Sequence, residues 1–232
     1  MNNYYSNNAT DMQALDAYVS RIMKQVYVKM FLALIVSALT ALAVPHIPAV
    51  AQFAFSKGGY IFLAIVEIGL VLWISAGINR MSSSTASLLF YLFAIVNGAT
   101  LSIIFLVYSP GSIMKTFFIT AGTFGAMSIY GYFTEKDLTK IGSFLIFALF
   151  GLIICSLVNL FAHSDTLGWI ISGAGVLIFL GLTAWDTQQI KQMALQSPNS
   201  GDGRLATIGA LSLYLDFINL FLYLLRFFGN RD

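Results

Sequence analysis

The sequence predicts an all-α polytopic integral membrane protein, and three observations carry that prediction. Of the 232 residues, 58% are hydrophobic and 9% are charged, whereas soluble domains are about 45–50% apolar and about 25% charged. Seven stretches are apolar over about 20 residues, the length at which a helix crosses the hydrocarbon core. The strict alternation of barrel strands is absent, so a transmembrane β-barrel is not expected.

The composition also excludes other classes of protein. A net charge of +2 with 15% aromatic residues fits neither nucleic-acid binding nor intrinsic disorder. One cysteine, Cys155, cannot form a disulfide framework or a multi-cysteine metal site. We expect it to be a small buried side chain.

The predicted spans follow one another so closely that residues 26–229 form one seven-helix transmembrane domain. Residues 1–25 are a polar tail with a disordered start and a short amphipathic helix, and residues 230–232 are a C-terminal tail. Proline, glycine and serine mark breaks after the first, third and sixth spans. The spans are Tyr27–Val44, Gly58–Ile78, Ala86–Val107, Ile113–Tyr132, Ile141–Ala162, Gly168–Trp185 and Leu205–Phe228.

The first span is predicted to be retained, because the polar segment before it is too long for a signal peptide. Eight of the twelve Lys and Arg residues then lie on the N-terminal side of the spans and four on the other. The positive-inside rule places the N-terminus in the cytoplasm and, after seven spans, the C-terminus outside. His46 and His163 fall in outer loops, as ordinary loop residues or as pH sensors.

The second span carries one acidic residue, Glu67, which needs a polar partner from another helix. Asn97 or Thr100 of the third span could serve, and a structural and a functional role are both open. Arg80, at the inner end of the second span, is either a positive-inside anchor or a partner of Asp186.

Small residues in the third and fourth spans predict close helix packing. The pairs are Gly98-x-x-x-Ser102 and Gly122-x-x-x-Ala126.

Asp186 ends the sixth predicted span, either as a solvated boundary residue or as part of a site. The sixth and seventh spans are consecutive and therefore expected to be antiparallel neighbours. If the sixth helix continues into TQQIKQMAL, Asp186 approaches Asp216 in depth. Two carboxylates in a poorly hydrated place cannot both ionise freely, so they would titrate as a pair. The pair would then be a proton-sensitive switch or a cation site.

The seventh span has a polar stripe with an aspartate near its middle, where an aspartate costs about 2.5–3.5 kcal/mol. Residues 4, 3, 4 and 3 apart share one helical face, which predicts a lined cavity, an ion path or a seam of hydrogen bonds between helices. The stripe is Ser212, Asp216, Asn219, Tyr223 and Arg226.

Four segments together resemble the Bax inhibitor-1 family, also called the transmembrane Bax inhibitor motif family, over about Lys24 to Gly229. They are ATLSIIFLVYSPGSIMKTFFITAGTFGAMSIYGYFTEKDLTKIGSF, GLIICSLVN, GLTAWDTQQIK and LSLYLDFINLFLYLLRFFG. Size and short tails are similar to those of the bacterial branch. The resemblance implies six helices around a central polar C-terminal helix, and a pH-sensitive calcium leak.

The resemblance also implies roles for single residues. Asp186 and Asp216 match the pair of aspartates that senses pH in the family. Arg80 matches the arginine that latches onto the sixth-helix aspartate in the closed state. Glu67 matches an acidic position of the second helix, and Trp185 departs from the tyrosine that the family often has there.

The expected function is therefore a proton-gated calcium leak in a bacterial plasma (inner) membrane, with no enzymatic activity. The candidate ion path adds Glu67, Ser212, Asn219 and Tyr223 to the aspartate pair, which would be a weak Ca²⁺ site. The expected partners are lipid, calcium ions and protons, with no cofactor beyond the permeating ion.

The sequence leaves two other functions open. One is a regulatory membrane protein that restrains a membrane protease or a cell-death or stress partner. The other is an intramembrane aspartyl protease, which the residues before Asp216 disfavour because they lack the Gly-x-Gly-Asp motif.

Overall fold

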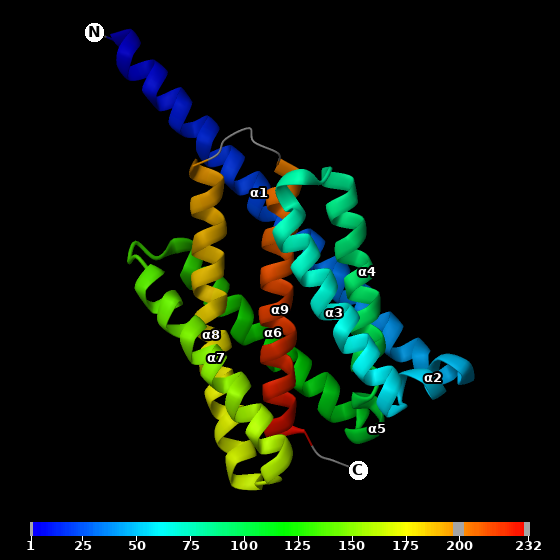
Figure 1. Ribbon diagram of the computed structural model, residues 1–232. Coiled ribbons are helices and arrows are strands. Elements are labelled where there is room, and N and C mark those ends of the chain that lie inside the picture. Colours follow the sequence, from blue (N-terminus) through cyan, green and yellow to red (C-terminus); the bar gives the residue numbers. More distant parts are fainter. Residues whose placement is uncertain (1, 197–201, 230–232) are drawn as a thin grey trace. The chain divides into compact units, whose positions relative to one another are not determined.

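The computed structural model describes residues 2–196 and 202–229, and the elements in those ranges are helices (Figure 1). The α-helices are α1 (Asn2–Ala43), α2 (Pro48–Ala54), α3 (Lys57–Gly77), α4 (Ser83–Leu101), α5 (Ile104–Val107), α6 (Pro110–Phe133), α7 (Thr139–Ala162), α8 (Asp165–Gln196) and α9 (Asp202–Phe228). Two 3-10 turns, η1 (Val44–His46) and η2 (Ile78–Arg80), follow α1 and α3. The predicted all-α class is confirmed. The expected break at 197–201 and the tail at 230–232 lie outside the described residues.

Within these ranges, six segments are long and apolar enough to cross a membrane, and they contain six of the seven predicted spans. They run over α1, α3, α4 with α5, α7, α8 and α9. The remaining prediction, Ile113–Tyr132, lies in α6. That helix has 24 residues, or about 36 Å, against a hydrocarbon core of about 30 Å. Threonine, serine and glycine make it less apolar, so the count of seven stays a prediction.

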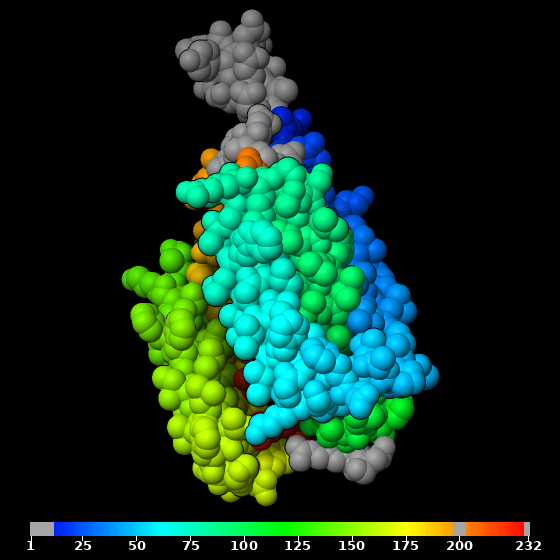
Figure 2. Space-filling view, turned by 45° about the vertical axis from the view of Figure 1, so that its right-hand side comes forward, coloured from blue at the N-terminus to red at the C-terminus, as the bar shows by residue number. Residues whose placement is uncertain are grey.

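Helices α3 and α7 expose the apolar side chains expected of a lipid-facing surface. Only 11% of the most apolar 18-residue window of each is buried. On α7, Phe144, Phe147 and Phe161 are 69%, 75% and 82% exposed. Figure 2 shows α3, in cyan, at the surface. So many exposed apolar side chains would be unfavourable in water, whereas contact with lipid accommodates them.

The chain divides into two compact units, and the first holds residues 1–101 and 189–211. Its core is α4 packed against α1 and α3. Gly98 of α4 lies against the backbone of Ser37 and the side chain of Thr40, both on α1. Ser37 Oγ donates a hydrogen bond to the carbonyl oxygen of Ala94 at 2.7 Å. The predicted close packing at Gly98 is therefore confirmed.

The expected disordered start of the N-terminal tail is wrong, since α1 begins at Asn2. Apolar residues recur three and four apart from Val19 through Ile22 to Val26, and all three are buried. This periodicity gives residues 19–26 one apolar face, which holds that part of α1 as a helix.

The second unit holds residues 102–188 and 212–232. In it, α6 packs against α9 through Phe124 and Phe217, whose ring centroids are 5.4 Å apart. Gly131 of α6 lies directly on the backbone of Ala184 in α8. Gly142 of α7 lies against the ring of Trp185, so two glycines set how closely α6 and α7 approach α8.

Two predictions about small residues are wrong. Gly122 and Ala126 are exposed, and a Cβ at Gly122 would meet nothing within 4 Å. The buried face of α6 carries Thr116, Phe124 and Ser128 instead. Cys155 is exposed rather than buried, because it lies on the outward side of α7.

Candidate functional site

The two aspartates singled out from the sequence meet in the second unit, where α8 and α9 supply one each. The carboxyl groups of Asp186 and Asp216 share a hydrogen bond. Helix α8 continues to Gln196, so Asp186 lies inside the helix. The predicted approach of the two carboxylates is confirmed, and Asp186 lies within a helix rather than at a helix end.

Asp216 is 5% exposed, and its second oxygen, Oδ2, is buried. That oxygen has no hydrogen-bond partner among the described residues. The hydroxyl oxygens of Thr187 on α8 and Ser128 on α6 are buried and unpaired in the same way. Ser128 lies one turn from Phe124, which contacts α9, and one turn from Gly131, which contacts α8.

Such unpaired oxygens are unusual, because buried polar groups are normally hydrogen-bonded. Thr187 follows Asp186 in α8, and Ser128 lies one turn from the two residues through which α6 contacts α8 and α9. They leave acceptor oxygens open to a proton, a water molecule or a passing cation.

A hydrogen bond between two carboxyl groups needs a proton on one of them, since an ionised carboxylate only accepts. Gain or loss of that proton changes the charge of the pair by one and makes or breaks the link between α8 and α9. The charge of the pair and the hydrogen bond between its members therefore both depend on protonation.

The rest of the polar stripe lies on the same face of α9 in the second unit. Asn219 Nδ2 donates to the carbonyl oxygen of Leu215 at 2.8 Å. Tyr223 lies beside Ser156 of α7 and close to Arg226. On the opposite face Leu213 and Leu220 are fully buried. With 61% of its most apolar window buried, α9 is the most buried of the six candidate spans.

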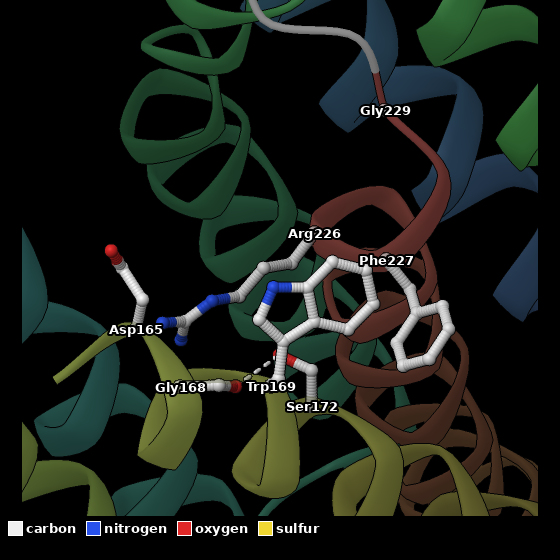
Figure 3. Close-up of a pocket in the computed structure, with 7 residues that line it drawn as sticks. All are labelled: Asp165, Gly168, Trp169, Ser172, Arg226, Phe227 and Gly229. Carbon is white, nitrogen blue, oxygen red and sulfur yellow. Dashed lines mark hydrogen bonds between the residues drawn. The ribbon is translucent and has the colours of Figure 1, made fainter.

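Two adjoining cavities lie at the C-terminal end of α9, and both are lined by Asp165 and Arg226. The larger, of about 400 Å³, is called the α9-end cavity and is lined by Ser156, Asn159, Leu160, His163, Ser164, Asp165 and Arg226. The smaller, of about 200 Å³, lies between α8 and α9 (Figure 3). In Figure 3 the Arg226 side chain reaches toward Asp165, and the rings of Trp169 and Phe227 lie edge to face. Sequence reasoning missed these cavities, although Arg226 at the end of the stripe was a signal.

Glu67 finds both of its predicted partners, within the first unit. Asn97 Nδ2 donates to Glu67 Oε2 at 3.0 Å, and Thr100 Oγ1 donates to Oε1. The expected partnership between the second and third spans is confirmed. A place for Glu67 in an ion path stays a prediction.

Arg80 is exposed in η2 and belongs to the first unit, whereas Asp186 belongs to the second. The latch between these two residues therefore stays a prediction. Another arginine joins η2 to α9 inside the first unit. Arg204 Nη1 donates to the carbonyl oxygen of Asn79 at 3.0 Å.

Lys29 forms a polar cluster that sequence reasoning missed, because it counted this residue only as a topological charge. Lys29 Nζ donates to Ser87 Oγ at 2.7 Å and Thr207 Oγ1 at 2.6 Å. It also donates to the carbonyl oxygen of Gly203 at 3.2 Å. The cluster joins α1, α4 and α9 in the first unit. The available signal was the position of Lys29 inside an apolar segment.

In the part of the chain that is described, no three His, Cys, Asp or Glu side chains come together as they do in a metal site. The Asp186–Asp216 pair offers few of the six to eight or so oxygens that Ca²⁺ takes in a strong site.

Comparison with known proteins gives the same family for nearly the whole chain. The family model described as inhibitor of apoptosis-promoting Bax1 matches residues 19–232. Inner membrane protein YbhL of Escherichia coli is 44% identical over 90% of this chain and 91% of its own length. An uncharacterized protein of Borreliella burgdorferi is 47% identical over 91% of this chain and 93% of its own length. An uncharacterized membrane protein of Streptococcus pyogenes is 42% identical over 75% of each chain.

These relatives are bacterial, and the match covers all of the helices that build the site. The chain therefore belongs to the Bax inhibitor-1 family, in its bacterial branch.

Proposed function

We propose that this protein is a pH-sensitive cation leak that passes calcium and is controlled by protonation of the Asp186–Asp216 pair. The observation that carries the proposal is the hydrogen bond between these two carboxyl groups on neighbouring helices. The unpaired Oδ2 of Asp216 supports it, because this buried oxygen is available to an ion.

The proposed control is competition between a proton and a cation. When both carboxylates are ionised, the pair carries two negative charges on hard oxygen ligands, which suit Ca²⁺. When they share a proton, one charge is lost and the carboxyl groups bind each other. A site with few ligands binds calcium weakly, as passage through a membrane requires.

The location follows the E. coli relative, which is named an inner membrane protein. We place this chain in a bacterial inner membrane, with its N-terminus in the cytoplasm. The lipid bilayer, calcium ions and protons are its proposed partners.

Calcium flux into proteoliposomes, between about pH 5 and pH 8, tests the proposal. We expect flux above that of empty liposomes, varying with pH, and a flattened pH response in Asp216→Asn. Asp137→Asn is the matched control, because Asp137 is an exposed carboxylate in the connection between α6 and α7. Flux equal to that of empty liposomes at every pH would contradict the proposal.

The arginine latch has its own variant in the same assay. If Arg80 holds Asp186 in a closed state, Arg80→Ala changes the pH at which flux rises or falls. An unchanged pH profile would remove the latch and leave the leak in place.

A second candidate function is regulation of a membrane protease or of a cell-death or stress partner. The length of α1 favours it, because 42 residues make a helix of about 63 Å, roughly twice the hydrocarbon thickness. Deleting residues 1–11 tests it without removing the buried Tyr18 and Val19. Loss of a copurifying membrane protein with unchanged calcium flux would favour regulation.

A further inference from the structure

We infer that the ring of Tyr223 is the barrier between the Asp186–Asp216 pair and the α9-end cavity. Removing that ring opens the pair to ions from the side where α9 ends. The inference deepens the proposed function, because it names the residue that closes one end of the proposed path.

Tyr223 has the right position along α9. It follows Asp216 by seven residues on the same face, which is two turns or about 10 Å. It precedes Arg226, which lines the α9-end cavity, by one turn. Any route along this face of α9 from the cavity to the pair therefore passes Tyr223.

The Tyr223 ring is held on two sides by α8. A Cβ added at Gly175 would lie 2.7 Å from two ring atoms, so the ring rests on bare backbone. Phe179, one turn further along α8, stacks on the ring with centroids 5.9 Å apart and planes 26° apart. An aromatic ring packed on a glycine and against a second ring leaves little space between α8 and α9.

The third side of Tyr223 is formed by α7. Its hydroxyl lies beside Ser156, and Ser156 lines the α9-end cavity. The hydroxyl end of Tyr223 is therefore next to the cavity, while its ring covers the way to Asp216.

Polar groups continue on both sides of this ring. Asn219 is the next polar residue toward the pair, and Asn159 and Arg226 line the cavity on the other side. Between these polar groups lies the Tyr223 ring with Phe179 stacked on it, so removing the Tyr223 ring removes the part of the barrier that α9 supplies.

The test is the accessibility of a cysteine placed behind the ring. Cys155→Ser removes the one native cysteine, and Asn219→Cys then places a thiol between Tyr223 and Asp216. A small charged thiol reagent that does not cross lipid is added to proteoliposomes, and the labelling rate is measured. Labelling of the denatured protein gives the full signal.

We expect slow labelling with Tyr223 present and labelling faster by about tenfold or more with Tyr223→Ala. Tyr223→Phe keeps the ring and is expected to label as slowly as the native residue. Equal rates with Tyr223 and Tyr223→Ala would overturn the inference, and so would fast labelling with Tyr223→Phe. If the alanine variant does not fold, Tyr223→Leu makes the same test with a smaller apolar side chain.

This readout separates the inference from the proposed function, because labelling needs no calcium flux. Fast labelling with Tyr223→Ala in a protein that passes no calcium would refute the leak and keep the barrier. Calcium flux in the native protein, with labelling that does not depend on residue 223, would refute the barrier and keep the leak.

Discussion

Lys29, Glu67 and Asp216 are charged residues within apolar helices, and their surroundings differ. Lys29 donates three hydrogen bonds to neutral oxygens, and Glu67 accepts two. Asp216 bonds to another carboxyl group and keeps one buried oxygen unpaired. Burying a charge is costly unless hydrogen bonds compensate it. The hydrogen bonds of Lys29 and Glu67 compensate their burial, whereas one buried oxygen of Asp216 has no such compensation among the described residues.

Lys29→Met is predicted to destabilise the protein by about 1.5–3 kcal/mol, the range for hydrogen bonds to a charged group. The loss frees Ser87 and Thr207 from the cation that joins α1 to α4 and α9. Unfolding in detergent measures it. Lys24→Met is the matched control, because Lys24 is exposed on the same helix. Equal stability of the two variants would show that the cluster contributes nothing.

The sequence indicated the environment of the buried acidic residues better than that of the partly buried lysine. Acidic residues inside spans are rare, so Glu67 and Asp216 were conspicuous, and few polar residues could partner Glu67. Lys29 lies near the beginning of an apolar segment, where lysine is also an ordinary topological charge. Its partner Thr207 is 178 positions away, a pairing that no local pattern encodes.

Among the helices, α8 determines where the candidate site forms, because Asp186 lies within it. Apolar residues alone would end this span near Trp185, but α8 continues to Gln196. Gln188 secures that continuation, because its side chain accepts a hydrogen bond from Leu138 N at 2.9 Å and donates to the carbonyl oxygen of Lys136 at 2.8 Å. The connection between α6 and α7 thus packs on α8 next to Asp186.

Gly131→Ala in α6 is predicted to destabilise the protein by about 1–3 kcal/mol through overpacking. The new methyl group would collide with the backbone of Ala184, two residues before Asp186. Gly125→Ala in the same helix is the control, because nothing lies within 4 Å of a Cβ there. Thermal unfolding compares the two, and a neutral Gly131→Ala would contradict the close approach of α6 and α8.

The first turn of α7 is predicted to loosen in acid. Thr139 N donates to Asp137 Oδ1 at 2.9 Å, and the hydrogen bonds from Thr139, helped by Lys140, hold the pKa of this carboxyl below its usual range. Because the pKa is lower in the folded state, the ionised Asp137 carboxylate stabilises the turn at pH values above the unfolded pKa of about 3.9. This stabilisation is lost as the pH falls through the pKa of the folded state. Amide exchange at Thr139, corrected for the intrinsic rate, should therefore quicken below about pH 4. Asp137→Asn should lack this step, and an identical step in that variant would refute the assignment.

The helices could be predicted from the sequence, but the glycines at which they pack closely could not. All seven predicted spans fall on helices, because length and apolarity decide their existence. The glycines that set helix packing could not be chosen, since Gly122 and Gly131 look alike in sequence. The difference between them depends on which face of α6 meets α8 and α9, and spacing within one helix does not contain that information.

For the whole molecule, the number of spans decides on which side of the membrane the chain ends. Seven spans place the C-terminus outside, whereas six place both termini on the same side. Helix α6 makes the difference, because it is long enough to cross but is not among the six candidates found in the described ranges.

Reporter fusions after Glu135 and at the C-terminus settle the role of α6. With seven spans, green fluorescent protein fluoresces after Glu135, and alkaline phosphatase is active at the C-terminus. The reversed pattern at both sites would mean that α6 does not cross the membrane.

The division into two compact units could not be predicted from the sequence. The boundaries fall after Gln188 and after Leu211, inside the continuous helices α8 and α9. No change in composition marks them, because the same apolar residues serve both units. The burial of α9 within the protein was predictable, because its polar stripe cannot face lipid.

The central claim is that protonation of the Asp186–Asp216 pair controls ion passage. Its most direct test is calcium flux against pH in the native protein, Asp186→Asn, Asp216→Asn and the double variant. Because coupled carboxyls titrate as one unit, each single variant should lose as much of the pH response as the double variant does. A native pH response that survives in the double variant would contradict the claim.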